Sequence, residues 1–570
     1  MKHYIIYIIA LTALTMPAMA QETYESANIA TEDVNGTARY VGMGGAMEAL
    51  GADISTISSN PASIGLFRKS GINFTVGATS LSGKDGSVAK EFKFDNQKSP
   101  MSLDQLGFVY AHEYDSGNFL NFGFTYRKSR NFNQILSHTG ALNGASLNKI
   151  PWQKDKIGNG YAGGYYYDFD ENDNLIGYVN ETSPQTSECF SQVDYLMLNF
   201  FTVDPNDLKP YYYNGKDYLF VRDQKGYIGS YDINISGNQN DRFYWGFTVG
   251  IKDVNYSHDQ VYRENIVDKN DDSAEYYDLY DTRYISGHGY DFNAGIIFRP
   301  IDASPLRIGF SVSTPTFYQL RSNNYTRIDN HGYDHNLDIH IGMLPDANHP
   351  PKSEDKYEYK VFTPWKFGVS VGYTIGKEIA LGASYTYSDY SSIDNRYITS
   401  YTHYDYYEPE SANSKSDKVM NHHTKNALQG VSTFKLGAEY KPMPELAIRA
   451  GYNYISPMYK TDAQRATCLE YTYKHYMDYE EPITGYYYSS STDYVNWGAT
   501  NRFSLGVGFL IDNFTIDVAY QRSMQKGDFH PFETIDVIDD FEDVYTPNKA
   551  PAVEVNNNRD QFLITLGYKF

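Results

Sequence analysis

The chain of 570 residues has few cysteines and, after its first twenty residues, no long apolar run. A helix that spans a bilayer needs about 20 consecutive apolar residues, so this absence excludes a bundle of membrane-spanning helices. The two cysteines, Cys189 and Cys468, fall in polar stretches that we expect to be loops. An oxidising compartment permits a disulfide between them, but loop position alone leaves the pairing open.

Basic residues are also scarce. The 48 Lys and Arg stand against 70 Asp and Glu, and the net charge of -22 argues against nucleic acid as a partner. The mean hydropathy of -0.54 is typical of a water-soluble protein. A transmembrane barrel has a similar value, because only every second strand residue faces lipid and the loops are polar.

The common motifs of enzymes and cofactor sites are missing as well. The glycines of residues 42–45 lack the third glycine of G-x-G-x-x-G, since Met47 stands there, and no βαβ pattern surrounds them. No G-x-S-x-G elbow is present. We therefore expect no enzymatic activity and no cofactor.

Three segments rich in carboxylates or histidines are weak candidates for metal sites. Residues 168–173 are similar to a calcium loop, but Asp173 stands where an EF-hand needs glycine and Val179 where it needs glutamate. The histidines and aspartates of residues 331–340 and the pair His422–His423 have no spacing that imposes a coordination geometry. We expect solvated loops and no metal site.

What is present begins with a secretory signal. A short polar start is followed by an apolar run from Tyr4 to Leu14, and Ala18-Met19-Ala20 has the pattern of a cleavage site. Residues 1–20 are therefore a predicted signal peptide, and the mature chain is expected to begin at Gln21. No cysteine follows the site, so a lipoprotein anchor is not indicated.

Aromatic residues are abundant, and apolar residues recur at every second position. The 56 Tyr and 31 Phe suit aromatic girdles at the two membrane interfaces. In residues 561–570 the even-numbered positions from Phe562 to Phe570 are apolar, and the odd-numbered ones are mostly polar, with Leu563 as the exception. Such alternation predicts β-strands with one apolar and one polar face.

About fourteen such strands can be counted, each of roughly the length that crosses a bilayer at a tilt. They begin near residues 71, 104, 119, 228, 242, 284, 305, 361, 378, 431, 445, 501, 513 and 560. Short turns alternate with long polar connections, the longest from about Phe132 to Lys225. This pattern predicts an antiparallel outer-membrane β-barrel, all-β and transmembrane, over residues 71–570, with the N- and C-termini on the periplasmic side.

The last strand ends in an aromatic residue. Phe570, with Tyr568 two positions before it, is similar to the C-terminal signal that outer-membrane insertion machinery recognises. We therefore expect that machinery, outer-membrane lipid and lipopolysaccharide among the partners of the protein.

Residues 21–70 do not alternate and are expected to form turns and short helices. Residues 38–46 have the sequence ARYVGMGGA, and residues 59–65 have SNPASIG. These segments resemble the N-terminal hatch of FadL-type transporters, which carry fatty acids and aromatic hydrocarbons through the outer membrane. The resemblance implies a fourteen-stranded barrel plugged by residues 21–70, in agreement with the strand count. Gly51 to Ile54 and Ser63 to Gly65 depart from the family pattern. The resemblance therefore supports the hatch fold more than it supports the identity of the substrate.

The resemblance implies that Gly42, Gly44, Gly45, Asn60, Pro61 and Ala62 shape or gate the hatch. Glycines allow positive φ and close backbone approach, and Asn before Pro favours a turn. A purely structural role in folding the plug is the alternative for each residue.

The leading functional hypothesis is a hatch-gated channel for passive uptake of hydrophobic small molecules, such as a long-chain fatty acid or an aromatic hydrocarbon. The alternative is a barrel of the same fold without transport, which binds at the cell surface or serves protein secretion like the type IX shuttle. A TonB-dependent receptor is a poorer third hypothesis, since it would need about twenty-two strands and a larger plug.

Overall fold

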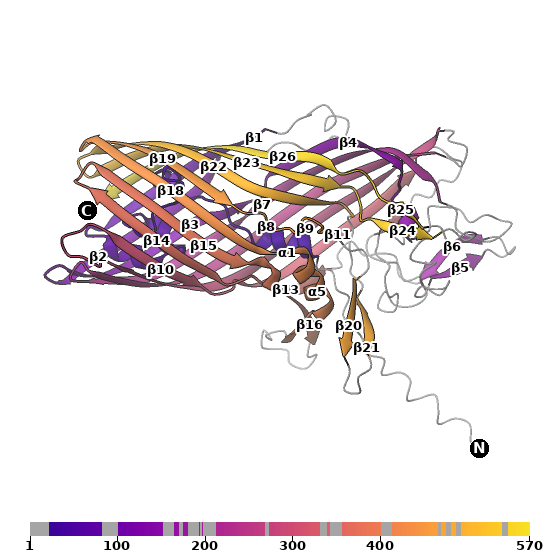
Figure 1. The fold of residues 1–570 in the computed structure, drawn as a ribbon, viewed down its shortest axis with the longest axis horizontal. Coiled ribbons are helices and arrows are strands. Elements are labelled where there is room, and N and C mark those ends of the chain that lie inside the picture. The colour runs from indigo at the N-terminus through magenta and orange to yellow at the C-terminus, as the bar shows by residue number, and fades with distance from the viewer. Residues whose placement is uncertain are drawn as a thin grey trace, which may run out of the picture.

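The computed structural model describes residues 22–82, 101–151, 165–169, 175–180, 193, 197, 212–267, 273–330, 339–341, 356–400, 413–465, 469–474, 480–485, 492–538 and 545–570. Its main feature is one antiparallel sheet that closes on itself (Figure 1). Among the described residues, no helix is long and apolar enough to cross a membrane.

Fourteen strands form the closed ring, as the period-two pattern predicts. The ring runs through β1 (Gly71–Ser82), β2 (Met101–Asp115), β3 (Asn118–Asn131), β7 (Asn214–Gln239), β8 (Phe243–Val267), β9 (Ser273–Phe298), β10 (Arg307–Ser313), β14 (Lys366–Ile375), β15 (Ile379–Asp389), β18 (Gly430–Met443), β19 (Leu446–Ile455), β22 (Tyr494–Ile511), β23 (Phe514–His530) and β26 (Val553–Lys569). The ring closes where β26 pairs with β1 from Lys569↔Gly71 to Asn558↔Ser82. A closed ring leaves no sheet edge in the bilayer, so every backbone polar group there can be paired.

The wall is apolar outside and polar inside. In β26, Phe562, Ile564 and Leu566 are about half exposed on the outer surface, whereas Thr565 is buried towards the lumen. Leu563, the exception to the alternation, is 0% exposed and packs on the segment inside the barrel. An apolar outer band around a polar interior is the arrangement of a membrane-spanning barrel.

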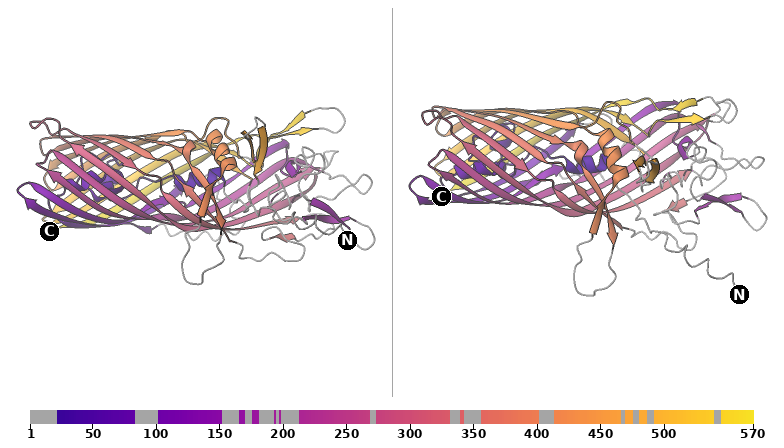
Figure 2. Two further views of the ribbon diagram at one scale, coloured as in Figure 1. Left: turned by 90° about the horizontal axis from the view of Figure 1, so that it is seen from below. Right: turned by 60° about the horizontal axis from the view of Figure 1, so that its bottom comes forward.

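The short turns gather at one end of the barrel and the long connections at the other, as expected (Figures 1 and 2). The connections differ in one respect from the prediction. Part of the segment from Phe132 to Lys225 forms β4 (Gln134–Gly144) and the first half of β7, and β8 and β9 extend through residues expected to be loop. With 25 or 26 residues each, β7, β8 and β9 far exceed the length that a bilayer requires, so their pairing continues beyond the membrane.

Two prolines interrupt neighbouring strands at the same height. β10 resumes as β11 (Phe317–Asn330) after Pro315, and β13 (Lys356–Phe362) continues into β14 after Pro364. Proline has no N–H to donate to a ladder. Thr363 and Thr316 keep the two strands paired at this point. Thr363 N–H donates to Thr316 O at 3.1 Å, and Thr363 Oγ1 accepts from Thr316 N at 2.8 Å.

The other described elements lie mainly on the long-connection side (Figure 2). They are β12 (Ile339–Ile341), β16 (Asp394–Ser400), β17 (Asn413–Ser416), the hairpins β5 (Tyr165–Phe169) with β6 (Leu175–Asn180), β20 (Leu469–Lys474) with β21 (Glu480–Gly485) and β24 (Ile535–Ile538) with β25 (Tyr545–Asn548), η3 (Tyr390–Ser392) and α5 (Lys418–Ala427).

The segment before β1 lies inside the barrel in every view (Figures 1 and 2). It contains α1 (Thr23–Ala30), α2 (Ala38–Gly42), η1 (Ile54–Ser58) and η2 (Pro61–Leu66). We call residues 22–35 the upper hatch and residues 36–66 the lower hatch. The upper hatch is on the side of the long connections, and the lower hatch leads towards β1 at the short-turn end.

The two ends of the described chain contact different parts of the barrel. Glu22 lies beside Arg465 in the long connection between β19 and β22, with Arg465 Nε 3.8 Å from Glu22 Oε1. At the short-turn end, Phe570 N donates to Ser70 O at 3.0 Å. Glu22 is thus buried within the barrel, whereas Phe570 is at the short-turn end, and the expectation that both termini are on the periplasmic side stays a prediction.

Candidate functional site

The glycines of residues 42–46 lie where the lower hatch contacts the barrel wall. A Cβ on Gly42 would be 3.2 Å from Gly506 Cα, and one on Gly44 would be 2.7 Å from Tyr452 N. Gly44 and Gly45 have φ values of +63° and +79°, which L side chains rarely adopt. The structure therefore gives these residues a packing reason to be glycine, and their role in gating stays a prediction.

The wall supplies a matching row of glycines that the sequence analysis did not single out. Gly372, Gly382, Gly437 and Gly451 are direct partners across four neighbouring strands, β14, β15, β18 and β19. A Cβ at any of the four would come within 3.0 Å of, or overlap, hatch backbone between residues 43 and 50. The signal in the sequence is a glycine at a lumen-facing position in each strand, but only the register shows that the four are aligned.

Asn60, Pro61 and Ala62 lie against the other side of the wall. Asn60 caps η2 by accepting from Ala62 N at 3.2 Å, and Pro61 is the first residue of that helix. A Cβ on Gly246 would overlap Pro61, and one on Gly309 would be 2.9 Å from Asn60 Nδ2. This second part of the hatch motif thus also packs closely against the wall at positions occupied by glycine.

Buried ion pairs add to the hold on the lower hatch. Arg39 in α2 contacts Glu439 in β18 at 3.1 Å, and Arg449 in β19 joins Glu439 at 2.7 Å to Asp517 at 2.6 Å. Asp53, in the segment that departs from the family pattern, caps η1 and accepts from Thr37 Oγ1 at 2.8 and 2.9 Å. The lower hatch is therefore fixed both to the wall and to itself.

A cavity of about 330 Å³ lies in the lumen beside the upper hatch. The upper hatch and three residues of the lower hatch line it, together with the strands and the residues between β19 and β22. Its size is at the lower end of the range for small-molecule sites, about 300–1,000 Å³. Aromatic and apolar side chains contribute to the lining, and they are Tyr24, Val34, Tyr40, Phe132, Tyr256, Tyr390, Val431, Ile455, Met458, Tyr459, Tyr494, Val495 and Trp497.

Charged side chains line the same cavity, with an excess of positive charge. The ten basic residues are Arg127, Arg130, Arg222, Lys252, Arg283, Lys366, Lys435, Arg465, Arg502 and Arg559. The six acidic residues are Glu22, Glu25, Glu32, Asp33, Asp291 and Asp493. A cavity with this lining is basic although the chain as a whole carries a net charge of -22.

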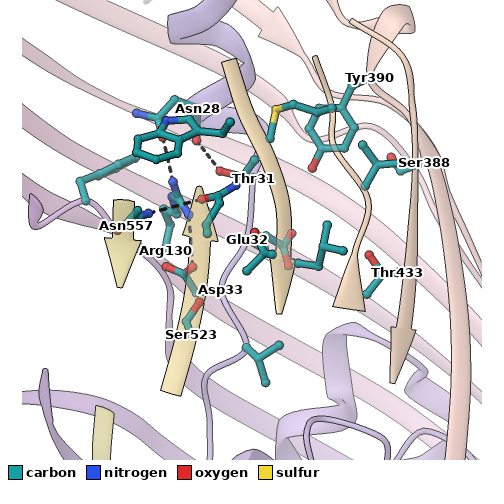
Figure 3. Close-up of a pocket in the computed structure, with 18 of the residues that line it drawn as sticks. Asn28, Thr31, Glu32, Asp33, Arg130, Ser388, Tyr390, Thr433, Ser523 and Asn557 are labelled. Carbon is teal, nitrogen blue, oxygen red and sulfur yellow. Dashed lines mark hydrogen bonds and ion pairs between the residues drawn. The ribbon is translucent and has the colours of Figure 1, made fainter. Parts of the chain in front are cut away.

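Three arginines surround Asp33 in the upper hatch. Arg130 Nη1 and Arg502 Nη2 lie 3.2 and 3.4 Å from Asp33 Oδ1, and Arg559 Nη1 lies 3.7 Å from Oδ2. Asn131 N donates to Oδ2 at 2.9 Å. In Figure 3 the Arg130 guanidinium lies between Asp33 and Asn28, whose Oδ1 it contacts at 2.8 Å. Burial acts to raise the pKa of Asp33, but the arginines lower it to about 2.

Glu32 points to a different pair of cations. Lys366 Nζ donates to Glu32 Oε1 at 2.6 Å, and Arg127 Nη2 lies 3.9 Å from Oε2. Burial acts to raise the pKa of Glu32, but the nearby cations, Lys366 first, hold it well below its usual range. Adjacent carboxylates of the upper hatch are thus both ionised and both paired with the wall.

The start of the upper hatch contacts the helix α5. Tyr24 stacks on Tyr459 with ring centroids 4.8 Å apart, and its OH donates to Asn496 Oδ1 at 2.8 Å. Thr23 Oγ1 lies 2.8 Å from His423 Nδ1, and His423 Nε2 lies 3.0 Å from Gln464 O. The pair His422–His423 is therefore in a helix and not in a loop, with His423 against the hatch and His422 exposed.

The predicted insertion signal is at the outer surface of the short-turn end. Tyr568 is 37% exposed and Phe570 57%, and the Tyr568 ring lies 4.7 Å from that of Phe514 in the next strand. Both side chains face outwards, where machinery or lipid can reach them, and their role as a signal stays a prediction.

Several other candidates lie wholly or largely outside the described residues: Cys189, Cys468, the acidic residues 170–173 and residues 331–338. In the part of the chain that the structure describes, no group of three or more His, Cys, Asp or Glu is arranged to hold a metal ion.

No protein-family model and no curated protein matches the sequence. Among solved structures, a FadL homologue of Pseudomonas aeruginosa is 12% identical, with 95% of this chain and 99% of that chain covered and a TM-score of 0.43. The toluene transporter TbuX of Ralstonia pickettii is 12% identical, with 94% and 99% covered and a TM-score of 0.43. The monoaromatic hydrocarbon channel CymD is 10% identical, with 94% and 98% covered and a TM-score of 0.43. Each of these similarities extends over nearly the whole chain, and the fold itself rests on the strand registers.

Proposed function

We propose that this protein is an outer-membrane channel for passive uptake of small molecules with a hydrophobic body, and that the hatch is its gate. The observation that carries the proposal is a hatch inside the lumen, with a partly aromatic cavity of about 330 Å³ beside its upper part. A solute that reaches this cavity must displace part of the hatch to go further. The FadL-like motif and the transporters and channels among the similar structures support the same function.

The upper hatch is the part best suited to move. Residues 31–37 have no regular secondary structure, and side-chain contacts at Glu32 and Asp33 hold them in place. The lower hatch meets the wall through backbone contacts at glycines and could not shift without opening that packing. Gating would therefore begin in the upper hatch, which precedes α2 in the chain.

Uptake by whole cells tests the transport function. A strain without the gene is compared with the same strain complemented by the wild type, and the initial uptake of labelled toluene and labelled 4-butylbenzoate is measured. We expect several-fold slower uptake in the deletion strain for at least one of the two solutes, because lipopolysaccharide slows apolar solutes in the absence of a channel. Equal rates for both solutes would overturn the proposal.

A cross-link tests the gate. Asn35 Nδ2 donates to Asp104 Oδ1 at 3.0 Å, which joins the upper hatch to β2. We expect the double variant Asn35→Cys/Asp104→Cys, with Cys189 and Cys468 replaced by Ser, to take up solute only after reduction. The two single-cysteine variants are the controls. Unchanged uptake in a fully cross-linked sample, verified by thiol titration, would show that the hatch does not gate at this position.

The long extensions of β7, β8 and β9 favour a second candidate function, which is binding at the cell surface without transport. These strands stay paired for about twice the length that a bilayer needs. Capture of one secreted or surface protein by intact cells, together with unchanged solute uptake in the deletion strain, would favour this alternative.

A further inference from the structure

The cavity is basic at one place in particular, around the two carboxylates of the upper hatch. Arg130, Arg502 and Arg559 surround Asp33, and Arg127 and Lys366 lie at Glu32. Five cations thus face two carboxylates. Uncompensated charge in a partly buried site is costly, and such a site attracts a further anion.

Some of the donors in this place have no acceptor. The Nε atoms of Arg127, Arg130 and Arg559 are buried without a hydrogen-bond partner among the described residues. Arg127 and Arg502 have side chains only 5% and 8% exposed. A guanidinium that uses only some of its five donors can accept another carboxylate or phosphate oxygen.

We infer that Arg130, Arg502 and Arg559 form the binding site for the acidic group of a small organic anion, and that Asp33 occupies this site in the closed channel. The inference rests on the proposed function and deepens it, since it names the chemistry of the ligand and the contact that the ligand breaks. Met458, Tyr459 and Trp497 line the same cavity and would cover the apolar body of the ligand.

The geometry gives the consequence of ligand binding. Asp33 contacts the arginines through its carboxylate, and its backbone N donates to Ser129 O at 2.8 Å. An anion that takes the arginines removes the three ion pairs of Asp33, so the segment from Thr31 to Asn35 loses its charged contacts with β3, β22 and β26 and keeps its hydrogen bonds to backbone atoms of β3. By reciprocity, whatever weakens the Asp33 contact must strengthen binding of the anion.

A binding measurement tests the competition. Full-length mature protein in nanodiscs of zwitterionic phosphatidylcholine, which carry no net negative charge, is titrated with 4-butylbenzoate, with the neutral 4-butylbenzyl alcohol and with inorganic phosphate. Protein-free nanodiscs give the background. We expect 4-butylbenzoate to bind about tenfold more tightly than either other probe, since only it combines a charge-assisted contact with an apolar body.

Two variants and one control make the test specific. Asp33→Asn should bind 4-butylbenzoate about tenfold more tightly than the wild type, because the competitor has lost its charge. Arg502→Gln should bind it at least about tenfold more weakly, with Arg502→Lys as a milder variant if the first does not fold. Asp302→Asn removes an exposed carboxylate paired with Arg242 at 2.9 Å, far from the cavity, and should bind like the wild type.

Hydrogen exchange reports the release of the hatch. We expect 4-butylbenzoate to speed exchange in residues 28–36 and to leave residues 42–62 unchanged. Equal or weaker binding to Asp33→Asn, or equal binding of the acid and the alcohol, would overturn the inference, whereas the proposed uptake would still stand if cells require the protein for toluene. If 4-butylbenzoate binds tightly and Asp33→Asn changes its affinity, but the deletion strain takes up solute at the wild-type rate, the binding site is supported and the channel function is rejected.

Discussion

The two parts of the hatch are held by different kinds of contact. The lower hatch lies backbone against backbone on the wall, with glycines on both sides, as where Gly44 meets Gly451. The upper hatch is held by side chains, through the carboxylates of Glu32 and Asp33 and the rings and hydroxyls of α1. Close packing over many atoms can be undone only by separating the surfaces, whereas an ion pair can be replaced by another ion. The lower hatch is therefore the stable part of the plug, and the upper hatch is the part that a ligand can move.

The largest effect is expected where the wall meets the lower hatch. Gly451→Ala places a Cβ against Gly44 N, so the hatch must withdraw or the strand must bend, at about 3 kcal/mol or more. The midpoint of guanidinium unfolding in micelles measures the loss. Ala450→Val, which enlarges the neighbouring lipid-facing residue, is the matched control and should stay close to wild type. Equal midpoints for the two variants would show that the close contact does not matter.

A smaller but still large effect is expected at Leu563. This side chain is 0% exposed and packs with Val41 and Met43 of the lower hatch, so Leu563→Ala should cost about 2–3 kcal/mol. Leu566→Ala removes the same atoms from the lipid face, where Leu566 is 52% exposed, and should cost less. The unfolding midpoint and exchange of residues 38–47 measure both, and a reversed order would contradict the packing described here.

The upper hatch should respond to pH with a definite sign. The pKa of Asp33 is lowered from 3.8 to about 2, so its contribution is fully present above the ordinary pKa and is lost as the pH falls through the lowered one. Hydrogen exchange of residues 28–36 should therefore be steady, after correction for intrinsic rates, from pH 8 to pH 5. It should rise below about pH 4, by the equivalent of about 2 kcal/mol. Asp33→Asn should show no such rise, and a rise already between pH 8 and pH 5 would assign the contact to another group.

The smallest effect is expected at the attachment of α1 to α5. His423→Gln weakens the contact to Thr23 Oγ1, at a cost of about 1 kcal/mol that is confined to the start of the upper hatch. Exchange of residues 23–27 measures it, with the exposed neighbour His422→Gln as the control. Faster exchange in the lower hatch as well would show that the two parts are coupled and would weaken the comparison.

Much of the wall could be predicted from the sequence. Alternation located the strands, their outward faces and their number, because the side-chain direction in a strand depends only on local geometry. Extended regions such as residues 253–267 were expected to be loops, since outside the membrane both faces of a strand can be polar and the alternation fades. The position of the hatch motif in the lumen came from a resemblance, and its contacts needed the structure.

The sequence by itself determined that the chain forms amphipathic strands with short turns at one end and that a non-alternating segment precedes them. These features are local, and each follows from the residues next to one another in the chain. Only the tertiary structure decided that Arg130, Arg502 and Arg559 meet at Asp33 and that glycines of four strands form one row. Ring closure brings β3, β22 and β26 around one lumen, and strand register aligns residues such as Gly372 and Gly451. Neither the closure nor the register depends on neighbours in sequence, so the cavity and its charge emerge only when the sheet closes around the hatch.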